Sequence, residues 1–261
     1  MDKLLQIVAL LRDPERGCPW DKAQDYRSIA PHTLEEAHEV VDAIERDDFD
    51  ELRDELGDLL FQVVLYSRMA EEQGRFTFSD ISRAIEEKLI RRHPHVFAGL
   101  QVTDSAAISK NWEDIKAEER SGKPHASGVL GGIPLALPAL SRAQKLGKRA
   151  GRIGFDWDES VFVLDKVYEE LAEVEQEIAA GSNPARLEDE VGDLLFSVTQ
   201  LARHLKLDAE AALRRAGAKF ERRFTSMEKI LIAQGIALSP DHRAAMEATW
   251  MQVKAQEKSS Q

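Results

Sequence analysis

One acidic pattern occurs twice in the chain, and this duplication constrains the fold more than any other feature. In the first half, EEAHE at 35–39 precedes DELGDLLF at 54–61, and in the second half EELAE at 169–173 precedes DEVGDLLF at 189–196. The gap between the paired acidic runs is 16 positions from Glu39 to Glu55 and 17 positions from Glu173 to Glu190. Self-similarity at a long period indicates one supersecondary unit used twice.

The spacing of apolar residues predicts helices throughout. The 15 glycines and 9 prolines cluster in a few places, and apolar residues between them recur at intervals of three and four. Two such stripes are Leu34, Ala37, Val41 and Ile44, and then Leu52, Leu56, Leu59, Leu60 and Val63. Thr33, with Glu36 three residues later, predicts a capping box that opens the first helix. Since no strand-like alternation recurs, we expect an all-α fold.

The repeat also predicts two domains. A length of 261 residues is long for one compact domain, and glycine and proline crowd together between Glu119 and Pro138. The matching motifs GCPWD at 17–21 and GFDWD at 154–158 precede the acidic runs of the two halves. We therefore predict one helical domain over 1–120, a linker over 121–138 and a second helical domain over 139–261.

Composition excludes several classes of protein. With 35 Lys and Arg against 47 Asp and Glu, the net charge of −12 argues against binding to a nucleic-acid backbone or an anionic membrane. The single Cys18 cannot form an internal disulfide, which fits a reducing cytoplasm. The longest nearly uncharged stretch, 128–140, contains two prolines and is shorter than the roughly 20 residues of a membrane span. We expect a cytoplasmic protein without a secretory signal.

The acidic residues could form a metal site. Residues three apart share one side of a helix, so Glu36 with Glu39, and Glu55 with Asp58, each present two carboxylates together. If the two helices pack antiparallel, the four carboxylates meet, and they would repel one another without protons or cations. Hard oxygen ligands of this kind suit Mg²⁺ or Mn²⁺. The second copy carries the same two pairs in Glu170, Glu173, Glu190 and Asp193.

A solvated acidic surface is the alternative interpretation. Helical-wheel geometry does not exclude it, because these acids flank the apolar stripes. However, Gly57 and Gly192 occupy the same place within the second acidic pair of each copy. A glycine inside a helix costs about 1 kcal/mol relative to alanine, so we expect another backbone or a ligand to approach closely there. The duplicated spacing therefore favours the metal site.

Pairs of cations and aromatics are also duplicated. Lys88 with Arg92, and Lys219 with Arg223, are four positions apart and could hold phosphate oxygens, or could be ordinary charges on a surface helix. Trp112 with Lys116, and Trp250 with Lys254, either contact a base or anchor the last helix of each half. Trp20 and Trp157 could stack on a nucleobase, but we expect them to close a core.

Other catalytic motifs are missing. The sequence contains neither a GxxxxGK[ST] phosphate loop nor a GxSxG nucleophile elbow, and Cys18 has no convincing catalytic partner. His93 and His95 flank a proline, which favours a helix-ending turn over a metal site.

Together, EExxE, a gap of about sixteen and ExxD in a GDLLF context resemble the MazG family of nucleoside triphosphate pyrophosphohydrolases. The resemblance covers essentially the whole chain, including GCPWD at 17–21 and RRHPHVF at 91–97. It implies two tandem helical-bundle domains, assembly into a homodimer and Mg²⁺-dependent hydrolysis of (d)NTPs to the monophosphate and pyrophosphate, with Mn²⁺ as a substitute metal.

The resemblance also implies roles for individual residues. The metal ligands would be Glu170, Glu173, Glu190 and Asp193 in the second copy, and Glu36, Glu39, Glu55 and Asp58 in the first. Phosphate and nucleotide contacts would fall on Lys219, Arg223, Trp250 and Lys254, and in the first copy on Lys88, Arg92, Trp112 and Lys116. The spacing from Lys88 to Trp112 differs from that between Lys219 and Trp250, so the first copy's nucleotide pocket follows the family pattern less closely than the second's. Either Glu169 or Glu173 would orient or deprotonate the attacking water.

Two rival functions belong to other classes. A metal-dependent phosphodiesterase acting on nucleic acid is disfavoured by the acidity of the chain and the lack of a basic stripe. Alternatively, one or both halves serve as a non-catalytic helical module for dimerisation or regulation, an interpretation that applies best to the first copy. The number of metals per site and the number of active copies stay open.

Overall fold

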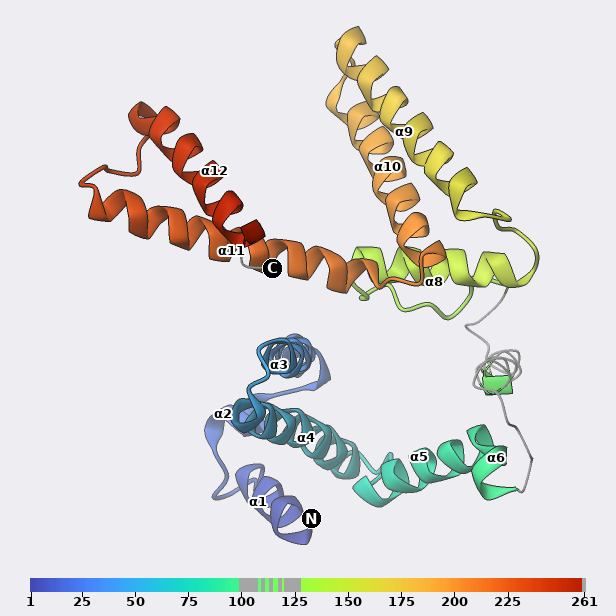
Figure 1. Ribbon diagram of the computed structural model, residues 1–261. Coiled ribbons are helices and arrows are strands. Elements are labelled where there is room, and N and C mark those ends of the chain that lie inside the picture. Colours follow the sequence, from blue (N-terminus) through green and yellow to red (C-terminus); the bar gives the residue numbers. More distant parts are fainter. Residues whose placement is uncertain (99–107, 109–110, 113–114, 117–118, 120–127, 260–261) are drawn as a thin grey trace. The chain divides into compact units, whose positions relative to one another are not determined.

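A computed structural model of the chain describes residues 1–98, 108, 111–112, 115–116, 119 and 128–259 (Figure 1). Every regular element among these residues is a helix, which confirms the all-α prediction. The chain divides into two compact units, Met1–Lys116 and Ala117–Gln261. Of the predicted linker over 121–138, residues 121–127 lie outside the described part. None of the described helices is both long and apolar enough to cross a bilayer.

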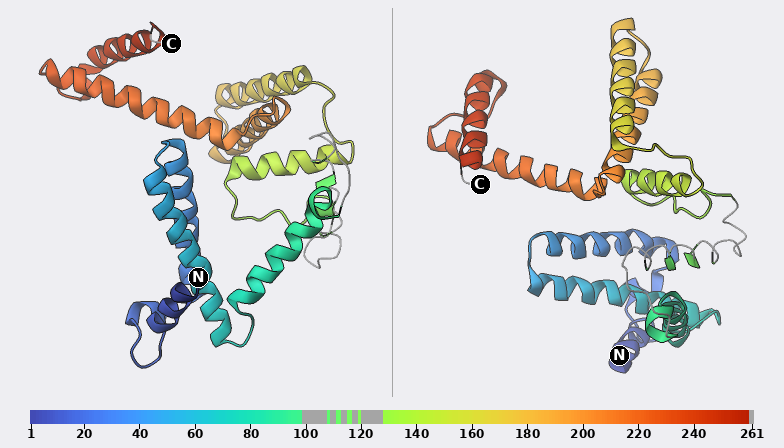
Figure 2. Two further views of the ribbon diagram at one scale, coloured as in Figure 1. Left: turned by 60° about the horizontal axis from the view of Figure 1, so that its bottom comes forward. Right: turned by 45° about the vertical axis from the view of Figure 1, so that its right-hand side comes forward.

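The first unit is built around an antiparallel helical hairpin. Its elements are α1 (Asp2–Leu11), α2 (Pro19–Ala23), α3 (Tyr26–Glu45), α4 (Phe49–Glu72), α5 (Phe78–Arg92) and α6 (Pro94–Phe97). The α3–α4 turn uses Asp47 in the left-handed region, with a φ of 55°, and Asp48 then caps α4 by accepting a hydrogen bond from the Glu51 backbone N–H. Figure 2 shows α3 and α4 side by side along most of their lengths. The two acidic runs of the first copy therefore face each other across one hairpin.

Helix α3 begins earlier than predicted. Its N-cap is Asp25, whose carboxylate accepts backbone hydrogen bonds from Arg27 and Ser28, while the Ser28 hydroxyl accepts one from the Asp25 backbone N–H. Thr33 lies inside the helix, where its hydroxyl is 2.9 Å from that of Tyr66 on α4. The predicted capping box at Thr33 is therefore wrong, because a second capping box two turns upstream starts the helix.

A small core holds the hairpin against α1. It contains Val8 from α1, Ile29 from α3, and Val64, Leu65 and Met69 from α4. These residues lie near the start of α3 and in the second half of α4, so the acidic runs lie beyond the core. The hairpin therefore presents its carboxylates away from the part of the unit that is best packed.

The second unit repeats the hairpin and adds another. Its elements are α8 (Ala139–Arg152), α9 (Ser160–Ala180), α10 (Pro184–His204), α11 (Ala209–Ala233), the short 3₁₀ helix η1 (Pro240–His242) and α12 (Arg243–Ser259). Asn183 caps α10 after the α9–α10 turn, and α8 packs against α10. A Cβ at Gly147 of α8 would lie 1.7 Å from the Gln200 side chain, so a larger residue there would force that side chain to move. Helices α11 and α12 form the second hairpin.

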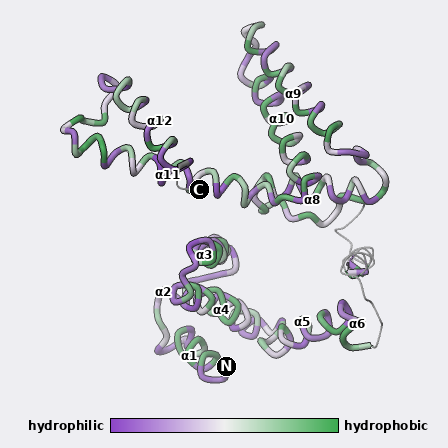
Figure 3. The backbone as a smooth tube through the Cα atoms, in the orientation of Figure 1, coloured by the Kyte–Doolittle hydropathy of each residue, from purple (hydrophilic) through white to green (hydrophobic). Residues whose placement is uncertain are grey.

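Several apolar side chains of the hairpins are exposed within the chain, including three from the two predicted stripes. Leu34, Ile44 and Leu56 are 51%, 54% and 49% exposed. On the α9–α10 hairpin of the second unit, Ile178 and Leu195 are 64% and 53% exposed. Figure 3 shows apolar segments alternating with polar ones along the α3–α4 and α9–α10 hairpins. Apolar faces of this extent are typical of surfaces that another protein surface covers.

Candidate active site

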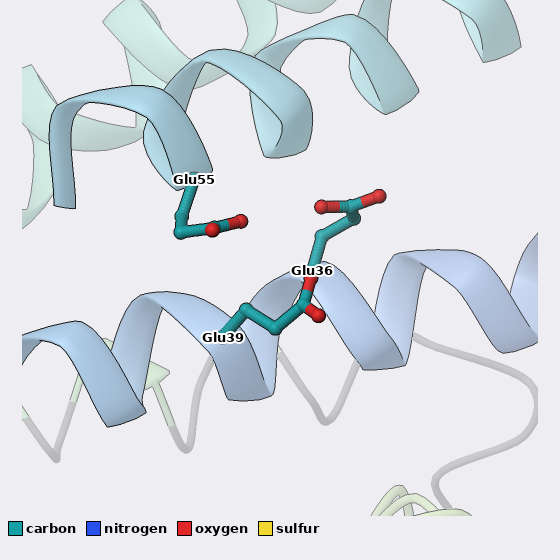
Figure 4. A group of neighbouring side chains, drawn as sticks. All are labelled: Glu36, Glu39 and Glu55. Carbon is teal, nitrogen blue, oxygen red and sulfur yellow. The ribbon is translucent and has the colours of Figure 1, made fainter. Parts of the chain in front are cut away.

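The first acidic cluster lies between α3 and α4. Glu36, Glu39 and Glu55 each offer a carboxylate oxygen, and these three atoms lie within 4.8 Å of one another. Figure 4 shows the three side chains extending into the space between the two helices. Asp58 is close enough for its charge to raise the pKa of both Glu36 and Glu55. The structure thus brings together all four acids predicted for the first copy.

Burial and mutual repulsion both disfavour ionisation of this cluster. Burial raises the pKa of Glu36, and the charges of Asp58 and Glu39 raise it further. Burial also raises the pKa of Glu55, followed by the charges of Glu39 and Asp58. A divalent cation would remove this repulsion and favour the ionised carboxylates. The donor set, four hard oxygens from two helices, therefore fits a divalent metal.

The second cluster has the same arrangement between α9 and α10. Oxygens of Glu170, Glu190 and Asp193 lie within 4.8 Å of one another, and the Glu170 side chain is only 6% exposed. Glu173 belongs to the same cluster, because a hydrogen bond shared with Glu170 raises its pKa, and burial and the charge of Glu170 raise it further. All four acids predicted for the second copy are therefore neighbours as well.

Two cations distinguish the second cluster from the first. The Lys166 ammonium is 2.7 Å from Glu170 and 2.8 Å from Glu169, and these hydrogen bonds raise the pKa of Lys166. Arg186 is 4.0 Å from Glu190 and 2.7 Å from Glu177. The sequence prediction missed both residues, although Lys166 lies four positions before Glu170, where a helical ion pair is expected.

The first copy has no such cations at these two positions. Counting back from the matched acids, His32 stands where the second copy has Lys166, and Glu51 stands where it has Arg186. The ring of His32 is 3.3 Å from Glu35, the counterpart of Glu169. Among the described residues, the first cluster therefore has no cation at the positions where the second cluster has Lys166 and Arg186.

The predicted phosphate and base contacts of the second copy lie on the α11–α12 hairpin. Arg223 forms an ion pair with Glu257 at 2.7 Å, and Lys219 is exposed. Trp250 packs against the cluster of Met227, Leu231 and Val253, and its ring lies 5.3 Å from that of Phe220. This packing corresponds to the alternative in which the tryptophan anchors the last helix, and contact with a base stays a prediction.

This hairpin does not join the second acidic cluster within the described chain. Helix α11 is attached at its N-terminal end, where the Ala209 backbone N–H donates to Gln144 of α8. Lys219 lies ten residues further along, which is about 15 Å of helix. Within the described residues, none of Lys219, Arg223, Trp250 and Lys254 forms a hydrogen bond, ion pair or ring contact with the acidic cluster.

Two of the corresponding residues of the first copy, Trp112 and Lys116, lie together beside His93. The Trp112 ring lies edge-on to His93 at 4.6 Å, and the Lys116 ammonium lies 5.5 Å from the centre of the same ring. His93 ends α5 and its Nδ1 is 2.7 Å from the Leu89 carbonyl, which confirms the helix-ending interpretation of His93. Lys88 and Arg92 occupy the last turns of α5. Their contact with phosphate stays a prediction.

Two local expectations are wrong for the chain itself. A Cβ at Gly57 or Gly192 would meet nothing within 4 Å, so no other described backbone approaches either glycine. Trp20 is 54% exposed and its ring lies edge-on to that of His32, so it does not close a core. Trp157 is half-buried against His204. The approach of a ligand to either glycine stays a prediction.

Comparison with known proteins gives consistent matches. The model of the MazG nucleotide pyrophosphohydrolase domain matches residues 24–97 and again 161–227. The chain is 55% identical to the nucleoside triphosphate pyrophosphohydrolase of Escherichia coli (strain K12), over 98% of both chains. It is 41% identical to the nucleoside triphosphate pyrophosphohydrolase/pyrophosphatase MazG of Thermotoga maritima, over 97% of this chain and 95% of that one. Each domain match contains one acidic cluster.

Proposed function

Since the chain belongs to the MazG nucleotide pyrophosphohydrolase family, we propose that it hydrolyses nucleoside triphosphates and their deoxy forms to the monophosphate and pyrophosphate. The observation that carries the proposal is the recurrence of four converging carboxylates in each domain match. Water is consumed and the anhydride bond between the α- and β-phosphates breaks. The acidic clusters support the proposed metal, and the names of the relatives support the proposed substrate.

We assign the metal to these clusters. Glu170, Glu173, Glu190 and Asp193 would hold Mg²⁺ in the second copy, and Glu36, Glu39, Glu55 and Asp58 in the first, with Mn²⁺ as a substitute. Bound Mg²⁺ supplies charge neutralisation for the triphosphate and a water of lowered pKa. The raised pKa values of Glu36, Glu55 and Glu173 support this assignment, because burial, a hydrogen bond between carboxyl groups and neighbouring acids disfavour ionisation, which a bound cation would favour.

Other side chains would position the substrate. Lys219 and Arg223 would bind phosphate oxygens, and Trp250 with Lys254 would contact the nucleoside. Glu169 or Glu173 would orient the attacking water or accept its proton. Glu173 has its pKa raised by Glu170 and by burial, which brings it nearer to that of a base working at neutral pH. Phosphoryl transfer gains mainly from such positioning and charge neutralisation.

We also propose a homodimer and a cytoplasmic location. The exposed apolar side chains of the α3–α4 and α9–α10 hairpins support the dimer, because a second chain would bury them. A dimer could also bring the α11–α12 hairpin of one chain to the acidic cluster of the other, which one chain does not achieve by itself. The single cysteine suits a reducing compartment.

The test is a panel of ribo- and deoxynucleoside triphosphates with identification of both products. With Mg²⁺, each accepted substrate should give its monophosphate, and a chelator should stop the reaction. The nucleotide product is diagnostic, since one relative is also named a pyrophosphatase and orthophosphate could arise secondarily. A nucleoside diphosphate product would refute cleavage between the α- and β-phosphates, and activity on single-stranded DNA would favour the phosphodiesterase alternative.

A regulatory role is a second candidate for the first copy alone. The replacement of Lys166 and Arg186 by His32 and Glu51 favours this role, because the first cluster lacks the cations of the second. In this case the first copy would bind metal and stabilise the dimer without turning over substrate. Substitution of acids in each copy of the full chain separates the two roles.

A further inference from the structure

A basic pocket lies in the second unit, between α8 and the turn that joins α10 to α11. Its volume is about 330 Å³, and its lining includes four cationic side chains. These are Lys145 and Lys148 on α8, Arg203 on α10 and Lys206 in the turn. Asp208 is the only acid in the lining, and its carboxylate already accepts a hydrogen bond from the Ala211 backbone N–H as the cap of α11. The lysines give the pocket an excess of positive charge in a chain of net charge −12.

Arg203 is fixed in place by buried and charged partners. Its Nε donates to Gln200, which is fully buried, and its two terminal nitrogens donate to Asp156 at 2.7 and 2.6 Å. These three bonds leave further N–H groups of the guanidinium for a ligand, because arginine has five donors. In contrast, no carboxylate among the described residues pairs with the ammonium of Lys145 or of Lys206.

The matching place in the first unit has a different character. A pocket of about 260 Å³ lies there between α1, α4 and the start of α5, and its only charged lining residues are Arg68 and Glu71. These two form an ion pair at 3.0 Å, so this pocket carries no excess charge. The positive charge is therefore a property of the second unit alone, and the shared fold does not account for it.

Lys206 also occupies a backbone position that favours glycine. Its φ is 59°, in the left-handed region, directly after the last residues of α10. After α4 in the first unit, the residue in the same conformation is Gly74, with a φ of 65°. A side chain is disfavoured in this region. The second unit thus places a lysine at the rim of the pocket at a site where the first unit uses glycine.

We propose that this pocket binds a diphosphate, with inorganic pyrophosphate as its simplest form. Converging cations and a guanidinium with unused donors recognise phosphate oxygens. The volume lies at the lower end of ligand pockets, and no aromatic side chain lines it, so a phosphate chain fits and a nucleobase gains no stacking partner. The lining of the pocket includes no residue of either acidic cluster, and its occupancy does not depend on the proposed hydrolysis.

Calorimetric titration of the full-length protein with pyrophosphate in EDTA tests the pocket. Without divalent metal the acidic clusters repel the anion, so binding reports the basic pocket. We expect binding that weakens with added salt and that is at least about tenfold weaker in Lys145→Glu/Lys206→Glu. The matched control is Arg222→Glu/Lys229→Glu, which makes the same charge change at exposed cations of α11 outside the pocket and should bind like the wild type.

Further measurements identify the preferred ligand and check that the variants are folded. Orthophosphate should bind several-fold more weakly than pyrophosphate, and a nucleoside triphosphate should bind no more tightly. Thermal unfolding of both double variants should match the wild type, since the substituted side chains are exposed. Absence of wild-type binding, equal loss in the control variant, or equal affinity for orthophosphate would overturn the proposal. None of these outcomes bears on nucleotide hydrolysis, which is measured with metal present.

Discussion

The two acidic clusters contain the same four types of acidic residue on corresponding hairpins, but they differ in how their charge is balanced. In the second copy, Lys166 lies 2.7 Å from Glu170, and Arg186 lies 4.0 Å from Glu190. In the first copy, those positions hold His32 and Glu51, and the pKa of both Glu36 and Glu55 is raised. The second cluster is partly neutralised by its own chain, whereas no ion pair joins a described cation to Glu36, Glu39, Glu55 or Asp58 of the first.

This difference leads us to expect that the two copies differ in function. The second copy combines the buried carboxylate of Glu170 with fixed cations, and groups with perturbed pKa values often mark functional sites. The first copy retains the four carboxylates but has His32 and Glu51 where the second copy has its two cations. We therefore expect catalysis to depend mainly on the second copy and metal-linked stability to depend strongly on the first.

The largest effect should come from removing ligands in one copy at a time. We expect Glu173→Gln or Asp193→Asn to lower kcat/KM for a nucleoside triphosphate by at least ~100-fold, because each removes a negative ligand of the metal. The matched changes Glu39→Gln and Asp58→Asn should lower it less than about threefold. Steady-state assays with Mg²⁺ on all four variants check this. Loss of activity only in the first-copy pair would transfer catalysis to the first copy.

The next effect concerns the internal cation of the second copy. Lys166→Met leaves the nearly buried Glu170 without its partner, so we expect the free energy of unfolding in EDTA to fall by roughly 1–2 kcal/mol. Saturating Mg²⁺ should restore most of the loss, because the metal replaces the missing positive charge. His32→Met in the first copy is the control and should change little. Denaturant unfolding of the two variants with and without Mg²⁺ gives these free energies. If Lys166→Met lost as much stability with Mg²⁺ present as in EDTA, the metal would not be replacing the missing positive charge.

The sequence allowed the hairpins and the carboxylates to be predicted, but not their neighbours. Periodicity and repeated spacing are local signals, and they placed Glu36 and Glu55 on facing helices correctly. The role of Lys166 was missed because a lysine among many charges has no signal until packing brings it to Glu170. Leu34 and Ile44 were assigned to an apolar stripe, but a single sequence does not show which surface covers that stripe. Thr33 was mistaken for a cap because Asp25 and Ser28 supplied the stronger capping box upstream.

A smaller effect should appear in the pH dependence of the first cluster. Because the folded-state pKa of Glu36 lies above its unfolded value, the folded state binds more protons in that window, and stability falls as pH rises through it. Glu36→Gln removes this penalty, so in EDTA it should raise Tm by about 2 °C at pH 7 and less near pH 4. Thermal scans at both pH values provide the measurement. A gain of equal size at both would show that repulsion between ionised acids is not the cause.

The smallest effect compares the two helical glycines. Because a Cβ at Gly57 or Gly192 meets nothing within 4 Å, alanine at either position should stabilise its helix by about 0.5–1 kcal/mol. If substrate approaches α10 closely at Gly192, Gly192→Ala should also raise KM severalfold, while Gly57→Ala should leave KM unchanged. Unfolding and kinetics on the two variants separate stability from function. A rise in KM for both variants would mean that the two hairpins contact substrate alike, whereas no rise in either would show that the glycines serve neither site.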